Sequence, residues 1–378
     1  MIFTIRDIEL LRLLRWCRYI DPGDLSIFDE RTVTNLAGLR LIRFQRSTKY
    51  LILTGKGNEF LEARMTDLPE RMPVSYKKHD ALRRTRVSQI SLTAYQAGMT
   101  VFTTGLQEFE KAFTFFLPTL MRTNSANPWS NSRIAALLRL GNTLYAAHYV
   151  CPGIGELLLA DELNAFMNNT GRIGNVRRAF FFVGESFSDI LAELDRPCIG
   201  DSTRYVSYAD AFRLLDLPVH LLPCDETGAM QLRLMALPDY RQRLSRAALK
   251  GQYAPAPPDV PAWDAMYEGK PFVVAADMEL KRIDAAIQAA QEKGLAPIAM
   301  IALKPQFEAV LKKRYREKGL ARVFTLKDDM LQELGASSLY VPPLDAYRTE
   351  KGEVIDAPLI QAARRTGGSG NQQIRRVV

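Results

Sequence analysis

The sequence is poor in residues that build covalent or metal-bound frameworks. Its 378 residues include only four cysteines and three histidines, which are dispersed, and no two cysteines have the C-x-x-C spacing. This pattern argues against a disulfide framework and a structural zinc site. No stretch approaches the roughly 20 apolar residues that span a bilayer, and the N-terminal segment mixes acids and arginines, unlike a signal peptide. We therefore expect a cytoplasmic protein with no membrane partner, metal or cofactor.

Several catalytic and nucleotide-binding motifs are also missing. The sequence contains no Gly-Lys-Ser/Thr phosphate loop, and Gly153 and Gly155 lack the rest of the dinucleotide fingerprint. Ser186 lacks the second glycine of a nucleophile elbow. The dispersed histidines cannot supply the histidine triad that relaxases place beside a nicking tyrosine. These absences favour a binding protein over an enzyme.

What the sequence does contain is an uneven distribution of charge. The chain is 47% hydrophobic and 24% charged, which is typical of a folded protein, and its net charge is +8. Residues 1–90 hold 17 Lys/Arg against 11 Asp/Glu, so six of the eight net positive charges lie in the first quarter. The length corresponds to two or three domains of about 150 residues each. We expect a basic N-terminal module on a near-neutral body.

The clearest local pattern lies between residues 31 and 62. Residues 32–37 are expected to form a helix, 41–44 and 50–53 a two-stranded ribbon, and 58–65 a helix capped by Thr54. After helices over 6–19 and 25–28, this order is that of a winged helix, a helix-turn-helix variant. From residue 31 to residue 58 there are six Lys/Arg and no acid, which favours a polyanion partner. A winged helix used for protein contacts, as in an adaptor, is the alternative.

The helix over 32–37 is the one expected to approach the major groove of duplex DNA. Asn35 is suited to read adenine, and Arg31 or Arg40 to contact guanine or phosphate. Arg46 and Lys49 at the ribbon tip would meet a minor groove or the backbone. A palindromic DNA site would make a second copy of the chain a partner. The full expected contact set is Arg31, Thr32, Thr34, Asn35, Arg40, Arg43, Arg46, Lys49 and Lys56.

Three segments carry a family resemblance: RDIELL at residues 6–11, LIRF and YLILTGKG within residues 41–57, and the following helix with His79. They resemble the replication–relaxation family of plasmid and conjugative-element proteins of Gram-positive bacteria. Gly141-Asn142 is a two-residue signal for a hairpin over residues 133–150. The resemblance covers about residues 1–100 and extends loosely over this hairpin and an expected strand at 230–234. It implies a DNA-binding accessory role in plasmid replication, mobilisation or their control, alongside other mobile-element proteins.

The expected fold class is α+β, with a winged helix followed by an α/β body. The C-terminal part alternates strands (272–276, 297–303, 321–325) with helices (279–293, 305–318), the βαβαβ pattern of a parallel sheet. Residues 230–236 are expected to be a strand in a hairpin turned at 225–228. The helix over 77–97 either packs on a partner subunit or forms the spine of this chain. The expected divisions are 1–68 (winged helix), 74–100 (connecting helix), 101–250 (central subdomain), 263–345 (C-terminal subdomain) and 362–378 (flexible basic tail).

One enzymatic alternative stays open, a metal-dependent nuclease. Asp259 follows a proline, and Glu279-Leu280-Lys281 follows an apolar strand, as the acids and lysine do in restriction-type nucleases. Asp259 and Glu279 would hold Mg²⁺, Lys281 would stabilise the attacking hydroxide or the developing phosphate charge, and Asp277 could join them. The competing interpretation is that Asp277 and Glu279 are ordinary acids at a helix N-terminus.

Overall fold

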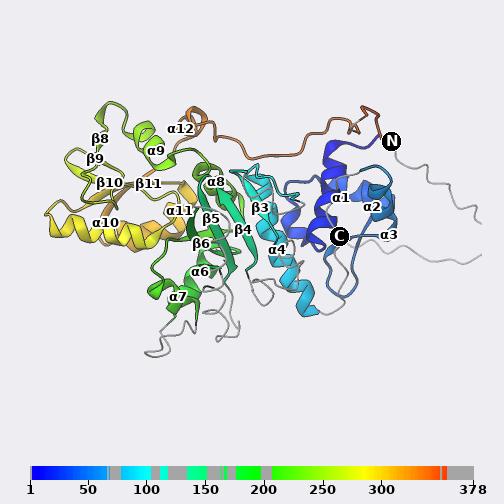
Figure 1. The fold of residues 1–378 in the computed structure, drawn as a ribbon, viewed down its shortest axis with the longest axis horizontal. Helices are drawn as coiled ribbons and strands as arrows, with labels where there is room; N and C mark the ends of the chain where they lie inside the picture. Colours follow the sequence, from blue (N-terminus) through cyan, green and yellow to red (C-terminus); the bar gives the residue numbers. More distant parts are fainter. Residues whose placement is uncertain are drawn as a thin grey trace, which may run out of the picture.

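The computed structural model describes residues 2–65, 68, 78–103, 111–117, 134–150, 163, 166–167, 176–196, 207–349 and 351–355. The fold is α+β, with N-terminal helices around a small two-stranded sheet and two larger mixed sheets (Figure 1). The expected boundary between 68 and 74 lies almost wholly outside these residues, and the expected tail at 362–378 lies entirely outside them. None of the helices in the described ranges has the length and apolar character that a bilayer crossing requires.

The N-terminal module consists of helices packed around a hairpin whose strands pair antiparallel. Thr54 accepts a hydrogen bond from the Gly57 backbone N–H and caps the last helix, as the sequence predicts. Gly57 is required for close approach, because a Cβ there would lie 2.2 Å from the carbonyl oxygen of Leu41. The elements are α1 (Ile5–Cys17), η1 (Pro22–Leu25), α2 (Glu30–Gly38), β1 (Ile42–Phe44), β2 (Leu51–Leu53) and α3 (Gly55–Glu62).

The first large sheet has the strand order β3-β4-β5-β6-β7. Its first three strands pair antiparallel, and β5, β6 and β7 run parallel. The predicted hairpin is confirmed, since Gly141 and Asn142 turn the chain between β4 and β5. The strands are β3 (Thr114–Phe116), β4 (Ala136–Leu140), β5 (Thr143–Tyr149), β6 (Arg177–Gly184) and β7 (Val219–Pro223). The helices that accompany this sheet are α4 (Lys78–Gln96), α6 (Phe187–Leu194), α7 (Tyr208–Leu214) and α8 (Glu226–Met235), whereas α9 (Tyr240–Leu249) packs against the second large sheet.

The strand predicted over residues 230–236 is wrong, because this segment belongs to helix α8. Asp225 caps the helix by accepting a hydrogen bond from the Gly228 backbone N–H. Leu232 and Met235, three positions apart, are both buried against the core. A Cβ at Gly228 would lie 1.9 Å from the Pro223 carbonyl oxygen, so the helix starts directly against β7. The run of apolar residues is short enough to fit both the two-residue period of a strand and the 3.6-residue period of a helix.

The second large sheet has the strand order β12-β11-β10-β9-β8. Strands β10, β11 and β12 run parallel with helices between them, as the sequence predicts. The sheet is nevertheless mixed, because β9 and β8 add an antiparallel edge that the sequence pattern does not predict. The strands are β8 (Ala254–Pro255), β9 (Ala265–Tyr267), β10 (Lys270–Val274), β11 (Ile298–Ala302) and β12 (Ala321–Thr325). The helices are η6 (Lys250–Gln252), α10 (Leu280–Glu292), α11 (Lys304–Gln306), the π-helix η7 (Phe307–Arg316) and α12 (Asp328–Glu333).

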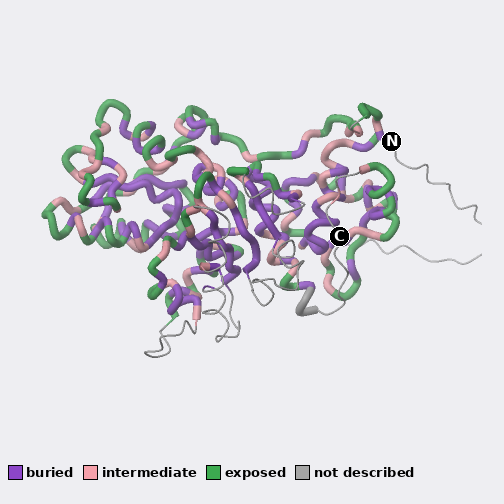
Figure 2. Tube along the Cα trace, in the orientation of Figure 1, coloured by how far each residue is buried: buried purple, intermediate pink, exposed green. Residues whose placement is uncertain are grey.

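The N-terminal module shares a hydrophobic core with the body. One cluster of buried side chains joins Ile8 and Leu61 of the module, Ile90 of α4, and Leu138 and Phe181 of the first sheet. Figure 2 shows this buried centre as an almost unbroken path through the middle of the molecule. Helix α4 therefore acts as an internal spine between the module and the body.

A second connection runs over the surface. Residues 337–349 and 351–355, called the strap from here on, extend from α12 to the N-terminal helices (Figure 1, orange). The Tyr340 backbone N–H donates to Gln96, and the Ile5 N–H donates to Asp345. The Phe3 N–H donates to the Ile355 carbonyl oxygen at 3.0 Å. The strap thereby ties the start of α1 to the far end of the body.

Candidate functional site

Five cationic side chains of the N-terminal module are exposed around α2 and the β1–β2 hairpin. Within the part of the chain that the structure describes, none of them makes an ion pair. Phe44 on β1 lies on the same hairpin and is 48% exposed, and residues 31–58 contain no acid that could offset the positive charge. We call this surface the cationic face and define it by Arg31, Arg40, Arg43, Arg46 and Lys49.

Helix α2 presents only part of the residues that the sequence assigned to a DNA contact. Arg31 and Thr34 are exposed and Asn35 is half-buried, so they share the outer side of the helix. Thr32 is 3% exposed and faces the core together with Leu36, so its expected contact with DNA is wrong. Positions 31, 34 and 35 lie on one side of a 3.6-residue helix, whereas position 32 is turned by about 100° from position 31.

Lys56 has a second role that the sequence did not reveal. Its Nζ donates to the Leu39 carbonyl oxygen at 3.1 Å, at the C-terminal end of α2. A cation at that position stabilises the negative end of the helix dipole. Lys56 is still exposed at the surface, but its ammonium group also interacts with the C-terminal end of α2.

Two residues of the cationic face have an unfavourable backbone conformation. Arg40 and Lys49 have φ angles of 61° and 67°, in the left-handed region where glycine and asparagine are the usual residues. Each such residue costs about 1 kcal/mol or more. The chain therefore keeps cationic side chains at both ends of the hairpin despite this strain.

The position of α2 is fixed from its N-terminus. Asp29 accepts a hydrogen bond from the Thr32 backbone N–H, and Arg6 donates to the same carboxylate at 2.6 Å. The Thr32 hydrogen bond, with the Arg6 charge, lowers the pKa of Asp29 from its ordinary value. Arg6 also donates from Nε to the Pro342 carbonyl oxygen in the strap. A short chain of polar contacts thus connects the strap to the helix at the cationic face.

A different group of charges lies at the junction of the two large sheets. Asp277 and Glu279 follow strand β10 and lie on either side of Met278, whose φ angle is 54°. Met278 is fully buried and its backbone N–H donates to Ala275. A strained, buried, non-glycine residue is expected where the surrounding structure imposes a special geometry, which is common at functional sites.

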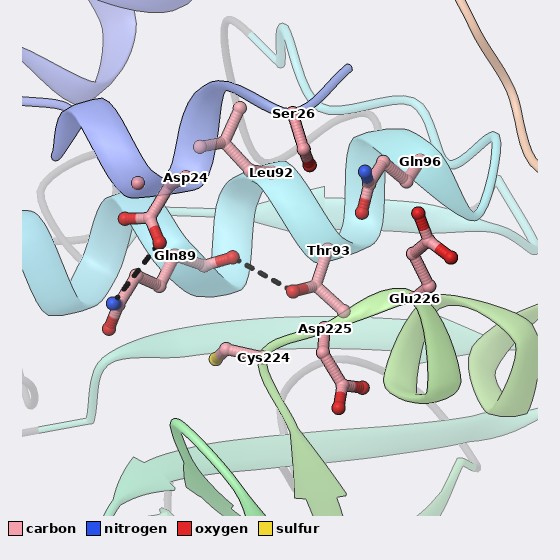
Figure 3. A pocket seen from close by; sticks show the side chains of 10 residues that line it. Asp24, Ser26, Gln89, Leu92, Thr93, Gln96, Cys224, Asp225 and Glu226 are labelled. Atoms are coloured by element: carbon pink, nitrogen blue, oxygen red, sulfur yellow. Dashed lines mark hydrogen bonds between the residues drawn. The ribbon is translucent and has the colours of Figure 1, made fainter. Parts of the chain in front are cut away.

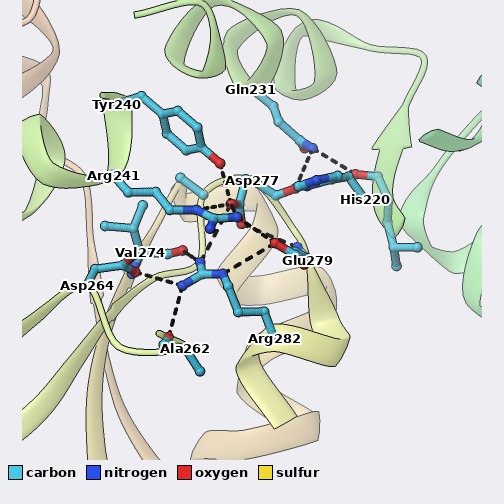
Figure 4. A network of polar contacts seen from close by, with 12 residues as sticks. His220, Gln231, Tyr240, Arg241, Ala262, Asp264, Val274, Asp277, Glu279 and Arg282 are labelled. Carbon is cyan, nitrogen blue, oxygen red and sulfur yellow. Dashed lines mark hydrogen bonds and ion pairs between the residues drawn. The ribbon is translucent and has the colours of Figure 1, made fainter. Parts of the chain in front are cut away.

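Arg241 from α9 bridges the two acids (Figure 4). Its Nε and Nη2 lie 2.8 and 2.5 Å from Asp277 Oδ2, and Nη2 lies 2.5 Å from Glu279 Oε2. The Tyr240 hydroxyl donates to Asp277, and Arg282 lies 3.6 Å away. Burial alone would raise the pKa of Asp277, but the two guanidinium groups and the hydroxyl outweigh it and hold that pKa well below its ordinary value.

His220 on β7 completes the group. Its Nδ1 lies 2.9 Å from the Asp277 backbone carbonyl oxygen, and since a carbonyl can only accept, Nδ1 carries a proton. Burial lowers the pKa of His220, against the opposing effect of Asp277 and Glu279, so the ring is neutral near pH 7. Nε2 then presents a lone pair, for which no donor is found among the described residues. Beside this group is a cavity of about 970 Å³, lined in part by His220, Arg241 and Glu279.

The structure assembles only two of the four residues of the nuclease alternative. Asp277 and Glu279 lie together, but Asp259 is an exposed residue that pairs with Lys293 at 3.0 Å. Lys281 Nζ donates to the Leu215 carbonyl oxygen at 2.6 Å. Glu279 and Lys281 are two positions apart where α10 begins, so their side chains leave the helix on opposite sides. The expected set of two acids and a lysine around one Mg²⁺ ion is therefore wrong.

No protein-family model, curated protein or solved structure matches the chain. The family resemblance of residues 1–100 thus stays a prediction.

A smaller polar pocket of about 180 Å³ lies where η1 meets α4 and α8 (Figure 3). Its lining includes Asp24, Thr93 and Glu226, and Gln89 donates to Asp24 at 3.4 Å. Burial raises the pKa of Asp24 to about 6, with smaller contributions from the charges of Asp21 and Glu185. The pocket therefore places a titrating carboxyl group between the N-terminal module and the body.

The raised pKa of Asp24 predicts that the free energy of unfolding depends on pH. A carboxyl group whose pKa is raised by folding contributes stability that is complete below about pH 4 and is lost as the pH rises through about 6. Asp24→Asn removes this loss, so at pH 7 the variant should be more stable than the wild type by about 1 kcal/mol, a figure reduced for partial exposure. Urea unfolding of both proteins at pH 4.5 and pH 7 measures the difference. An equal pH dependence in the two proteins would contradict the prediction.

Proposed function

We propose that this protein binds duplex DNA with sequence selectivity through its N-terminal module, which we interpret as a winged helix. Helix α2 would enter the major groove, and the β1–β2 hairpin would be the wing that meets the backbone or a minor groove. The observation that carries the proposal is the cationic face, five exposed cations without an ion pair in the described part of the chain. The resemblance to the replication–relaxation family supports an accessory or regulatory role on a bacterial mobile element.

The arrangement of side chains on α2 favours base recognition over charge attraction alone. Arg31, Thr34 and Asn35 share one exposed side of the helix, and these side chains carry both hydrogen-bond donors and acceptors. The hairpin adds Arg43, which is exposed on β1, and the cations of its turn. A protein-binding winged helix would not require this concentration of unpaired charge.

The test is the salt dependence of binding to a duplex selected from a random library. If all five cations of the cationic face meet phosphates, the logarithm of the affinity should fall with the logarithm of salt concentration with a slope of about −4.5. Fluorescence anisotropy between about 50 and 300 mM NaCl, a range over which phosphate contacts weaken strongly, measures this slope. A protein that retards no duplex at low salt would be an adaptor instead. A palindromic selected site would indicate a dimer.

A further inference from the structure

The group at the junction of the two large sheets has a donor set that the proposed DNA binding does not use. One ring nitrogen of His220 and one carboxylate oxygen each of Asp277 and Glu279 lie within 4.8 Å of one another. His220 is 2%, Asp277 0% and Glu279 9% exposed. One imidazole and two carboxylates suit a divalent transition-metal ion such as Mn²⁺ or Zn²⁺.

His220 has the hydrogen-bonding arrangement of a metal ligand. Histidines that bind metals usually donate the N–H of the other ring nitrogen to a carbonyl or carboxylate, which fixes the tautomer and the ring orientation. Here Nδ1 donates to the Asp277 carbonyl oxygen, so Nε2 is the atom with the free lone pair. In the described ranges no residue donates to Nε2, although the side chain is almost fully buried and borders the cavity. The lone pair of Nε2 is therefore available to a ligand in the cavity.

The charges around this group favour a cation. Within the group itself, three acids (Asp264, Asp277 and Glu279) face two guanidinium groups (Arg241 and Arg282), which gives a net charge of −1. Arg241 lies between Asp277 and Glu279, in the position that a metal ion bound to both would take.

The two guanidinium groups differ in how much open space lies beside them. The Arg282 side chain is 8% exposed, and its Nη1 donates to both the Asp264 carboxylate and the Ala262 carbonyl oxygen. The Arg241 side chain is 29% exposed and borders the cavity. Of the two, Arg241 is therefore the one that has space to turn into, if its contacts with the acids are replaced by those of an ion. With three protein ligands, an ion would keep further coordination positions open toward the cavity.

We propose that His220, Asp277 and Glu279 form a binding site for a divalent metal ion. Arg241 substitutes for the ion in the metal-free protein and moves into the cavity when the ion binds. The site is separate from the cationic face, so it neither requires nor excludes DNA binding.

Electron paramagnetic resonance of the full chain titrated with MnCl₂ tests the proposal. The wild type should bind Mn²⁺ with a nitrogen hyperfine coupling from the imidazole, and His220→Gln should lose this coupling and at least about tenfold in affinity. Arg241→Gln should bind Mn²⁺ at least about tenfold more tightly, because it removes a cation that competes for the same carboxylates.

The matched control is Asp259→Asn, which removes an acid from a surface ion pair and should leave the affinity unchanged. The proposal is overturned if neither the wild type nor Arg241→Gln binds Mn²⁺, or if the nitrogen coupling persists in His220→Gln. Circular dichroism shows whether each variant is folded. Should His220→Gln not fold, Glu279→Gln decides, and wild-type affinity in that variant would overturn the proposal.

Discussion

Replacing Arg241 with methionine should lower the free energy of unfolding by about 3–5 kcal/mol, the effect of breaking a buried ion pair from one side. The change leaves Asp277, which is fully buried, without the guanidinium group that contacts it at 2.5 Å. Arg282, 3.6 Å away and already paired with Asp264, can replace only part of that interaction. Urea unfolding at pH 7 measures the loss. Adding Asp277→Asn to the variant should recover part of it, because an amide needs no cation.

Arg314→Met is the matched control, since it removes the same group from a solvent-exposed pair. Arg314 lies 3.2 Å from Asp284, and both side chains are about one third exposed or more. Exposed pairs of this kind contribute about 0–1 kcal/mol. A loss in Arg241→Met no larger than in Arg314→Met would contradict the prediction.

The stability difference between wild type and Arg241→Met should also depend on pH. Because the pKa of Asp277 is lowered by folding, its contribution is complete above the unfolded value of about 4 and is lost as the pH falls below it. The two proteins should therefore differ most near neutral pH and converge in acid.

Replacing Arg43, Arg46 and Lys49 together with alanine should lower the affinity for duplex DNA by about 100-fold at 0.1 M salt. All three are exposed cations of the hairpin or its turn. Losing three phosphate contacts should also reduce the magnitude of the salt slope by about 2.7. Fluorescence anisotropy titrations of the variant over the same salt range measure both quantities.

The control removes the same net charge from the body. Lys313, Lys318 and Lys327 are exposed residues on or after the helices of the second large sheet. Their joint replacement with alanine should leave the affinity within about threefold of the wild type, since long-range attraction is screened beyond about 10 Å. Equal losses in both triple variants would show that net charge alone drives binding and would contradict the assignment to the hairpin.

Local patterns in the sequence predicted local structure well. The hairpin at 42–53 and the Thr54 cap depend on neighbours within a few residues, and both are present in the structure. The turn at Gly141-Asn142 was likewise predicted from adjacent residues and is present in the structure. The strand prediction for residues 230–236 is wrong because the apolar residues of this segment fit a strand and a helix alike. The packing of α8 on β7, and not the local sequence, determines that the segment is a helix.

The charged group at the sheet junction could not be predicted in the same way. Asp277 was a candidate, but Arg241 lies 36 residues before it and His220 57 residues before it. Neither belongs to a recognisable motif, and helix α9, which carries Arg241, was not anticipated. The only local signal was the pair of acids on either side of Met278. Asp259 and Lys281 were grouped with them by proximity in sequence, which does not report the side of a helix on which a residue lies.

The hydrogen bond between Phe3 and Ile355 joins residues that are about 350 positions apart, a separation at which closing the chain costs appreciable entropy. During synthesis, α1, α2 and the hairpin leave the ribosome long before their strap partner does. The polar chain from Pro342 through Arg6 to Asp29 can form only after almost all of the described chain has been made. Contacts of such high sequence separation form slowly. A segment translated long after α1 and α2 thus completes the support of these two helices.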